Sequence, residues 1–109
     1  MTDLFSAADE AAALEDLHNR NMTDGLPVII PTPARVSKMV LASGQDADMV
    51  LGTMGPANGM ATLQKVAVAA VMAGCLPDYM PLVVAALKAV IDPRFDLTEM
   101  QATTHCTAP

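Results

Sequence analysis

The sequence predicts a small, mostly helical α+β fold, in which an apolar helical hairpin over about residues 60–91 is accompanied by short strands and completed by a partner chain. Three observations lead to this prediction. Two nearly uninterrupted apolar segments, 61–74 and 78–91, flank Leu76-Pro77-Asp78. Of the 109 residues, 52% are hydrophobic and only 17% charged, against about 25% charged in an average soluble domain. A chain this short buries little more than roughly 60% of its unfolded surface, so apolar residues are expected at an interface.

Residues 1–23 are expected to form an acidic helical arm. Ser6 can cap a helix that runs to about His18, because a serine hydroxyl satisfies a free N–H group of the first turn. Leu14 and Leu17 share one face of this helix. Acidic side chains concentrate in the same stretch and are expected to face solvent (Asp3, Asp9, Glu10, Glu15, Asp16).

Residues 24–109 are expected to form a single small domain that is half of a larger shared fold. Leu26 to Pro31 is a short apolar extended segment, and its prolines suit an edge or an arm. Thr32-Pro33 predicts a helix start, since a capping hydroxyl followed by proline is typical of the first helical positions. This helix should end at Ser43-Gly44, and Val50-Leu51-Gly52 is expected to be a brief strand.

The second half of the chain contains the apolar hairpin. A glycine-rich loop, Met54 to Gly59, precedes a helix expected over about Ala61 to Gly74. Asp78 can cap the next helix, and Asp92-Pro93 should end it, because the residue before proline is disfavoured in a helix. Leu97 to His105 is expected to be a strand.

Composition and charge exclude several classes of function. The net charge is −6 and the six Lys and Arg residues are scattered, which argues against nucleic-acid binding. Met1 is followed by neither a basic nor an apolar leader segment. The longest apolar run, Val66 to Leu76, is shorter than the roughly 20 residues that span a bilayer. No membrane role is therefore expected, the cytoplasm is the default compartment, and the two cysteines are expected to be free thiols.

The glycine-rich loop and Lys65 are the first candidates for chemistry. Backbone N–H groups of Gly55 to Gly59 at a helix start could hold a carboxylate or a phosphate, or the loop is a plain turn. It matches neither common nucleotide-binding pattern, so no nucleotide cofactor is indicated. Lys65 either extends outward into solvent or, if buried, acts as an acid/base or as an anion anchor.

The cysteines and His105 are the other candidates. Cys75 follows a helix end, where the helix field does not activate a thiol, so it is expected to be a small buried hydrophobe. His105 and Cys106 could support acid/base, nucleophilic or metal chemistry. In a strand they would face opposite sides, so they are not expected to form a dyad. Two ligands are too few for a closed zinc site. Whether His105 binds a metal is left undecided by the sequence.

Five short stretches occur in order at plausible spacing: Gly25-Leu26-Pro27-Val28, Pro31-Thr32-Pro33-Ala34-Arg35-Val36, Ala61-Thr62-Leu63-Gln64-Lys65-Val66-Ala67, Val71-Met72-Ala73-Gly74-Cys75-Leu76-Pro77 and Gln101-Ala102-Thr103-Thr104-His105. Together they resemble the N-terminal part of the UGSC family of (seleno)proteins, over about residues 24–109. That family is named for a Sec/Cys-Gly-Ser-Cys motif, which this chain lacks. Cys106 stands where the family pattern has proline. The resemblance implies further protein after the Thr-Thr-His segment, in the same or a separate chain.

The leading hypothesis is a small subunit of a hetero-oligomeric enzyme that acts on a small molecule by lyase, hydrolase or thiol-redox chemistry. Its active site would lie at the junction with a larger subunit. The candidate catalytic residues are His105, Lys65 and Cys106, and the candidate substrate-binding residues are Asn58, Gly59 and Thr104. One alternative is a non-catalytic structural subunit that stabilises a larger catalytic partner. Another is a free-standing helical binding module that uses its Met-rich surface.

Overall fold

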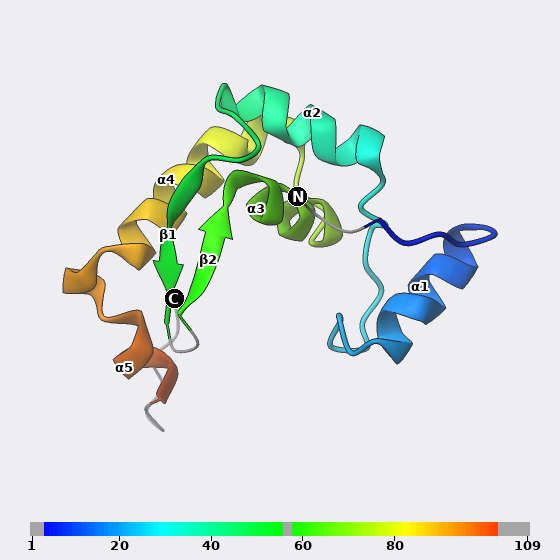
Figure 1. Cartoon of the computed structure of the whole chain (residues 1–109), viewed down its shortest axis with the longest axis horizontal. Helices are drawn as coiled ribbons and strands as arrows, with labels where there is room; N and C mark the ends of the chain where they lie inside the picture. Colours follow the sequence, from blue (N-terminus) through cyan, green and yellow to red (C-terminus); the bar gives the residue numbers. More distant parts are fainter. Residues whose placement is uncertain (1–3, 56–57, 103–109) are drawn as a thin grey trace.

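The computed structural model describes residues 4–55 and 58–102 and shows a mostly helical α+β fold (Figure 1). Within these residues lie five α-helices, two short 3-10 helices and a two-stranded antiparallel sheet. In chain order the elements are α1 (Glu10–Asn19), α2 (Pro33–Ser43), β1 (Val50–Met54), β2 (Gly59–Thr62), α3 (Leu63–Met72), η1 (Pro77–Tyr79), α4 (Met80–Ile91), η2 (Pro93–Phe95) and α5 (Leu97–Ala102).

Helices α2, α3 and α4 pack together and enclose the main core. Leu63 and Met80 are fully buried, and Met39 of α2 is nearly so. The buried residues of this cluster come from these three helices and the β2–α3 junction (Val36, Met39, Leu63, Ala67, Ala70, Val71, Met80, Val84). The predicted apolar hairpin is therefore confirmed as α3 and α4, joined through η1.

Helix α2 forms where local capping chemistry predicts it. The Thr32 hydroxyl accepts a hydrogen bond from the Arg35 N–H at 3.3 Å, and Pro33 occupies the first turn, where no N–H partner is needed. Gly44 ends the helix with φ = 71°, a left-handed conformation that glycine adopts without a Cβ clash. Both predicted boundaries of this helix are confirmed.

The strand β1 is confirmed, whereas its partner β2 was not predicted. Thr53 of β1 pairs with Met60, so the end of the glycine-rich loop belongs to an antiparallel hairpin. Helix α3 consequently begins at Leu63, two residues later than expected, with the Thr62 hydroxyl as its cap. The four residues of β2 are extended because they pair with β1, which a local pattern does not reveal.

The β1–β2 hairpin lies close against the end of α4 and the start of α5. A Cβ on Gly52 would lie 2.7 Å from Cγ2 of Ile91, and a Cβ on Gly55 would lie 2.0 Å from Oγ1 of Thr98. Real Cβ atoms essentially never approach other atoms so closely, so a side chain at either position would force Ile91 or Thr98 to move.

The strand expected from Leu97 to His105 is wrong for residues 97–102, which form α5. Asp96 turns the chain with φ = 55°, and its carbonyl oxygen accepts a hydrogen bond from the Met100 N–H. Its carboxylate also accepts from the Glu99 N–H, as in a helix cap. Residues 103–105 of the expected strand lie outside the described residues.

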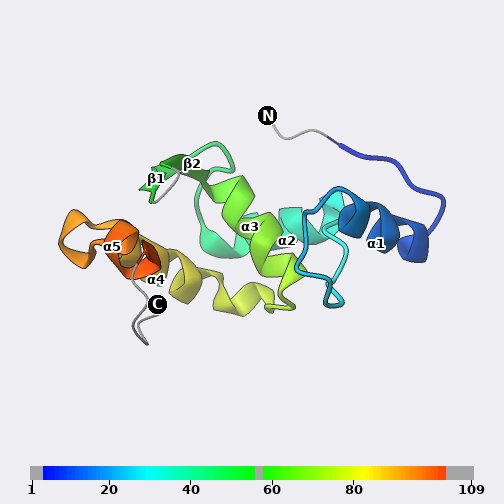
Figure 2. The same ribbon diagram turned by 90° about the horizontal axis from the view of Figure 1, so that it is seen from below.

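The N-terminal arm (residues 4–24) stands apart from the helical body. Its helix α1 begins at Glu10 and is capped by Asp9, whose carboxylate accepts from the Ala12 N–H at 2.8 Å, so the predicted start after Ser6 is wrong. Figures 1 and 2 place α1 and α5 at opposite ends of the molecule. A connecting segment (residues 25–31) leads from the arm to α2.

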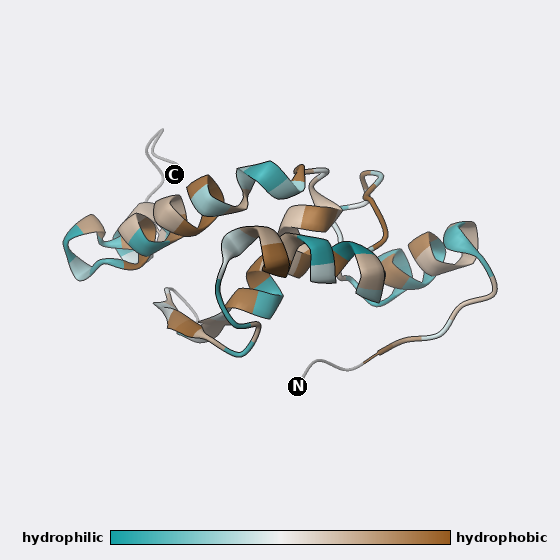
Figure 3. Cartoon of the chain, turned by 90° about the horizontal axis from the view of Figure 1, so that it is seen from above, coloured by the Kyte–Doolittle hydropathy of each residue, from teal (hydrophilic) through white to brown (hydrophobic). Residues whose placement is uncertain are grey.

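Much apolar material remains at the surface. Figure 3 shows apolar residues, in brown, along α3 and α4 and in the connecting segment. The exposed large side chains include Leu26, Leu76, Tyr79 and Leu82. Within residues 4–55 and 58–102, no helix combines the length and apolar content needed to cross a membrane.

Candidate functional site

A polar pocket of about 250 Å³ lies between the tip of the hairpin and the junction of α4 with α5. Three parts of the chain meet there: β1 with its turn, the end of α4 with η2, and the first residues of α5. The lining residues are Thr53, Gly55, Asn58, Val90, Ile91, Asp92, Pro93, Asp96, Leu97 and Thr98. The lining residues carry hydroxyl, amide and carboxylate groups, which can hydrogen-bond to a polar molecule.

The two carboxylates of the pocket are held by local contacts. The Arg94 guanidinium and backbone N–H bind the Asp92 carboxylate and lower its pKa below the usual value. The carboxylate of Asp96 caps α5 through the Glu99 N–H. Asp92 therefore stays ionised at neutral pH, and the lining carries negative charge.

Of the predicted site residues, the structure brings Asn58 to this pocket. Asn58 has φ = 57°, a left-handed conformation that asparagine tolerates well, and it lies in the hairpin turn. Gly59 follows as the first residue of β2 and is exposed, and a Cβ there would meet no atom within 4 Å.

Lys65 does not line the pocket. Its side chain is exposed, and its Nζ donates a hydrogen bond to the Met60 carbonyl oxygen at 3.3 Å. Of the two alternatives for Lys65, the structure shows the one in which the side chain extends outward into solvent. Lys65 therefore lies on the hairpin side of α3, separate from Asn58 in this chain.

The anion-binding hypothesis for Gly55 to Gly59 loses its physical basis. The loop is a turn between two strands, not the N-terminus of a helix. Helix α3 begins only at Leu63, where the Thr62 hydroxyl already accepts from the Lys65 N–H. The helix field therefore does not act on this loop.

Thr104, His105 and Cys106 lie outside the described residues. The chain reaches them directly from α5, whose Thr98 lines the pocket seven residues before His105. Helix α5 ends at Ala102, and the expected opposite orientation of His105 and Cys106 falls outside the described residues.

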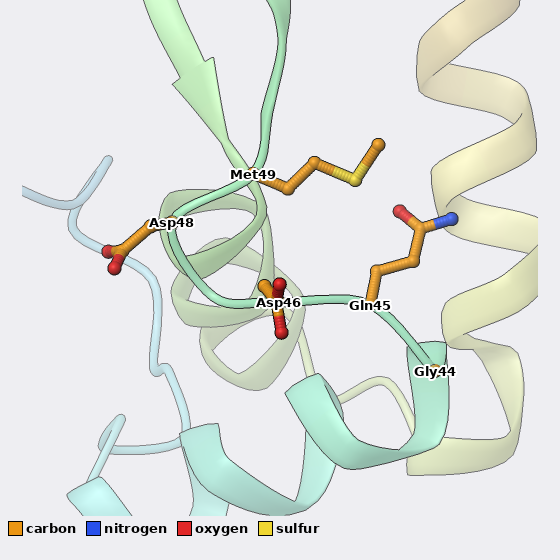
Figure 4. Close-up of a pocket in the computed structure, with 5 residues that line it drawn as sticks. All are labelled: Gly44, Gln45, Asp46, Asp48 and Met49. Atoms are coloured by element: carbon orange, nitrogen blue, oxygen red, sulfur yellow. The ribbon is translucent and has the colours of Figure 1, made fainter.

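A second, wide-open pocket of about 530 Å³ lies after the end of α2, lined by Gly44, Gln45, Asp46, Asp48 and Met49. Oε1 of Gln45 is buried there without a hydrogen-bond partner. Figure 4 shows the Gln45 amide directed toward α4, whereas Asp48 points away to the opposite side. These polar groups do not converge on one point, so the pocket lacks the geometry of a binding site.

The candidate metal ligand His105 and the candidate nucleophile Cys106 lie outside the described residues, so only the other such groups can be placed. No group of three or more His, Cys, Asp or Glu side chains in residues 4–55 and 58–102 could hold a metal ion. Cys75 is a free thiol, partly exposed, that packs against the helical core. Cys75 is therefore less buried than the small buried hydrophobe that was expected.

Sequence reasoning missed most of the pocket lining, including Asp92, Asp96 and Thr98. One signal was present: Asp96 is followed three residues later by Glu99, the spacing of a capping box. That spacing indicates a helix start at Leu97, which would have placed Thr98 in a first turn facing the hairpin.

Comparisons with models of protein families, with curated proteins and with solved structures found no match for this chain. Two features of the molecule bear on its function: the polar pocket at one end of α4 and the exposed apolar side chains at the other.

Proposed function

We propose that the chain is the small subunit of a hetero-oligomeric enzyme that acts on a small molecule, with its active site at the junction with a larger subunit. The observation that carries this proposal is the exposed apolar surface at the start of α4. Leu76, Tyr79 and Leu82 are 57%, 50% and 73% exposed. Three large apolar side chains so close together on a small protein indicate a docking surface.

The composition of helix α4 supports the same docking surface. Met80 and Val84 face the core, but Leu82 on another side of the same helix is exposed. The helix is apolar on nearly every side, with Lys88 as its single charged residue. A helix of that composition is typically buried all round, so a partner is expected to cover the side that α2 and α3 leave free.

One partner can reach both ends of α4. The helix has 12 residues, a length of about 18 Å, with the apolar surface at its start and the polar pocket at its end. A larger subunit lying along α4 would bury Leu82 and at the same time close the pocket beside Asn58. A closed pocket excludes water, which strengthens polar interactions with a substrate.

The chemistry of this proposal comes from residues near the pocket. Asn58 and Thr98 provide hydrogen-bonding groups, and His105 follows α5 as the acid/base or ligand. Cys106 is the candidate nucleophile, and Lys65 would anchor an anionic substrate carried by the larger subunit. The proposed reaction on a small molecule is lyase, hydrolase or thiol-redox chemistry.

A non-catalytic structural subunit is the second candidate, and one observation favours it. Lys65 and Asn58 do not meet in this chain, and the Lys65 ammonium group is bound to a backbone carbonyl. On this alternative the apolar side of α4 stabilises a larger catalytic partner, which supplies every reacting group itself.

Co-expression with the product of the neighbouring reading frame tests both candidates. We expect Leu82→Asp to abolish binding of the larger subunit, because it places a charge in the apolar contact. Leu41→Asp, on the equally exposed Leu41 of α2, is the matched control and should leave binding intact. Assembly that tolerates Leu82→Asp contradicts the proposed docking surface.

Substituting His105 separates the enzyme from the scaffold. With assembly intact, His105→Ala should lower turnover by about 10²-fold or more if His105 is the acid/base. His18→Ala is the control, since His18 lies in the arm and binds Thr23. Unchanged turnover of the His105 variant supports the structural subunit instead.

A further inference from the structure

The N-terminal arm is held together mainly by its own residues. The Asp16 carboxylate binds the Arg20 guanidinium at 2.9 Å, and that guanidinium lies 4.0 Å from the centre of the Phe5 ring. His18 binds the Thr23 hydroxyl. The one buried residue of α1, Leu17, does not belong to the main core cluster. The arm is therefore a separate unit that can change its position without disturbing the body.

A single ion pair fastens α1 to the body among the described residues. Nη1 of Arg35 lies 2.8 Å from Oε1 of Glu10, and the two side chains are 42% and 67% exposed. The same Nη1 donates to the Ile30 carbonyl oxygen at 2.9 Å. An ion pair that is so exposed contributes little to the free energy of folding. It therefore orients the arm relative to the body without fixing it strongly.

The connecting segment is built to stay extended. Pro27 and Pro31 fix their own φ angles and disfavour helix in the residues before them. Ile29 is tied to the body by its N–H, which donates to the Met72 carbonyl oxygen at 3.2 Å. Leu26 and Ile29 are nonetheless about half exposed or more. The segment therefore carries the arm away from the body and leaves apolar side chains uncovered.

Large apolar side chains are exposed along the arm and the connecting segment. Five of the twelve large exposed apolar side chains of the described residues lie in the arm and the connecting segment: Leu4, Phe5, Met22, Leu26 and Ile29.

We propose that two copies of this chain exchange their N-terminal arms, so that Glu10 of each copy pairs with Arg35 of the second copy. The docking position at the start of α2 is identical in both copies, so exchange reproduces every existing contact of the arm. The two connecting segments then run past each other near the twofold axis, where Leu26 and Ile29 of both copies become covered. That additional burial favours the exchanged dimer over two closed monomers.

Charge reversal in two separate chains tests the exchange. In the Glu10→Arg variant, and equally in the Arg35→Glu variant, like charges meet both in a closed monomer and in a homodimer. When the two variants are mixed, an exchanged heterodimer restores two attractive pairs, whereas a closed chain restores none. Native mass spectrometry of the mixture should show heterodimers enriched at least about tenfold over the statistical ratio.

The controls keep the result interpretable. The Glu10→Arg/Arg35→Glu double variant restores the pair within one sequence and should dimerise like the unaltered chain. The enrichment of heterodimers in the mixture should disappear near 1 M salt, because the screening length there is about 3 Å. Circular dichroism confirms that each variant is folded. A monomeric unaltered chain overturns the proposal, and so does a dimer whose variants mix at the statistical ratio. The α4 surface takes no part in this exchange, so statistical mixing of the two variants overturns the arm exchange alone, and binding of the larger subunit by the Leu82→Asp variant reports on the α4 surface separately.

Discussion

Helices α1 and α3 are both ten residues long and both begin with a side-chain cap, yet different forces hold them. Helix α3 buries Leu63, Ala67, Ala70 and Val71, whereas α1 buries only Leu17. Helices this short are marginal in water by themselves. Packing therefore maintains α3, while α1 relies on its Asp9 cap and nearby charges. The difference indicates that α3 depends on tertiary packing more than α1 does, as the proposed arm exchange requires.

The largest expected effect comes from the core of the body. Leu63→Ala should lower the free energy of unfolding by about 2–5 kcal/mol, because it leaves a cavity at a fully buried position. Leu4→Ala, in the exposed start of the arm, should change it by less than about 0.5 kcal/mol. Urea unfolding at one fixed protein concentration measures both. Equal losses for the two variants would remove the distinction between body and arm.

A smaller effect is expected where the hairpin meets α5. Gly55→Ala should destabilise the body by about 1–3 kcal/mol, since its Cβ would overlap Oγ1 of Thr98. Gly59→Ala is the matched control, because a Cβ there meets nothing within 4 Å. The comparison of the two melting curves checks the close contact that forms one wall of the polar pocket. Indistinguishable curves contradict that contact.

Capping substitutions should separate the two regions more finely. Thr32→Ala, at the start of α2, should lower the global free energy of unfolding by about 1 kcal/mol. Asp9→Ala should destabilise only α1 and leave the global free energy of unfolding unchanged. Hydrogen exchange read residue by residue measures this, with faster exchange confined to α1 in the second variant. Accelerated exchange of α3 amides in the Asp9 variant argues against an independent arm.

The smallest effect concerns the Asp92–Arg94 contact at the pocket. Because the pKa of Asp92 is lowered in the folded chain, this contact stabilises the protein above the usual aspartate pKa of about 4 and is lost as pH falls through the lower folded value. Arg94→Ala should slightly lower stability above about pH 5, where the contact is formed, and leave stability unchanged at acid pH, where the contact is already lost, so the acid-side dependence becomes weaker. NMR titration of the Asp92 carboxyl provides the reading, and an unchanged pKa in the variant contradicts the assigned cause.

Local chemistry explains which parts of the fold the sequence could predict. The Thr32-Pro33 start and the Gly44 end of α2 depend on neighbouring residues alone, so both were correct. The strand β2 depends on its pairing with β1, which no pattern within Gly59–Thr62 reveals. Helix α5 was taken for a strand because its six residues carry weak periodicity, although the spacing of Asp96 and Glu99 indicated a cap.

The candidate site was less predictable for a geometric reason. The pocket joins residues 45 positions apart, such as Thr53 and Thr98, and only the packing of the β1–β2 hairpin against α5 brings them together. Asn58 was singled out because a glycine-rich turn is conspicuous in the sequence. Lys65 was singled out as an isolated charge in an apolar helix, and its contact with the Met60 carbonyl oxygen depends on the unpredicted strand β2.

Sedimentation velocity of the purified chain, over a range of concentrations, tests most directly the claim that this protein is completed by other chains. The account predicts species larger than the 11.4 kDa monomer at all but the lowest concentrations, because exposed apolar side chains on α4 and on the connecting segment need cover. A chain that sediments as a monomer throughout, and melts in one sharp cooperative transition, would contradict it.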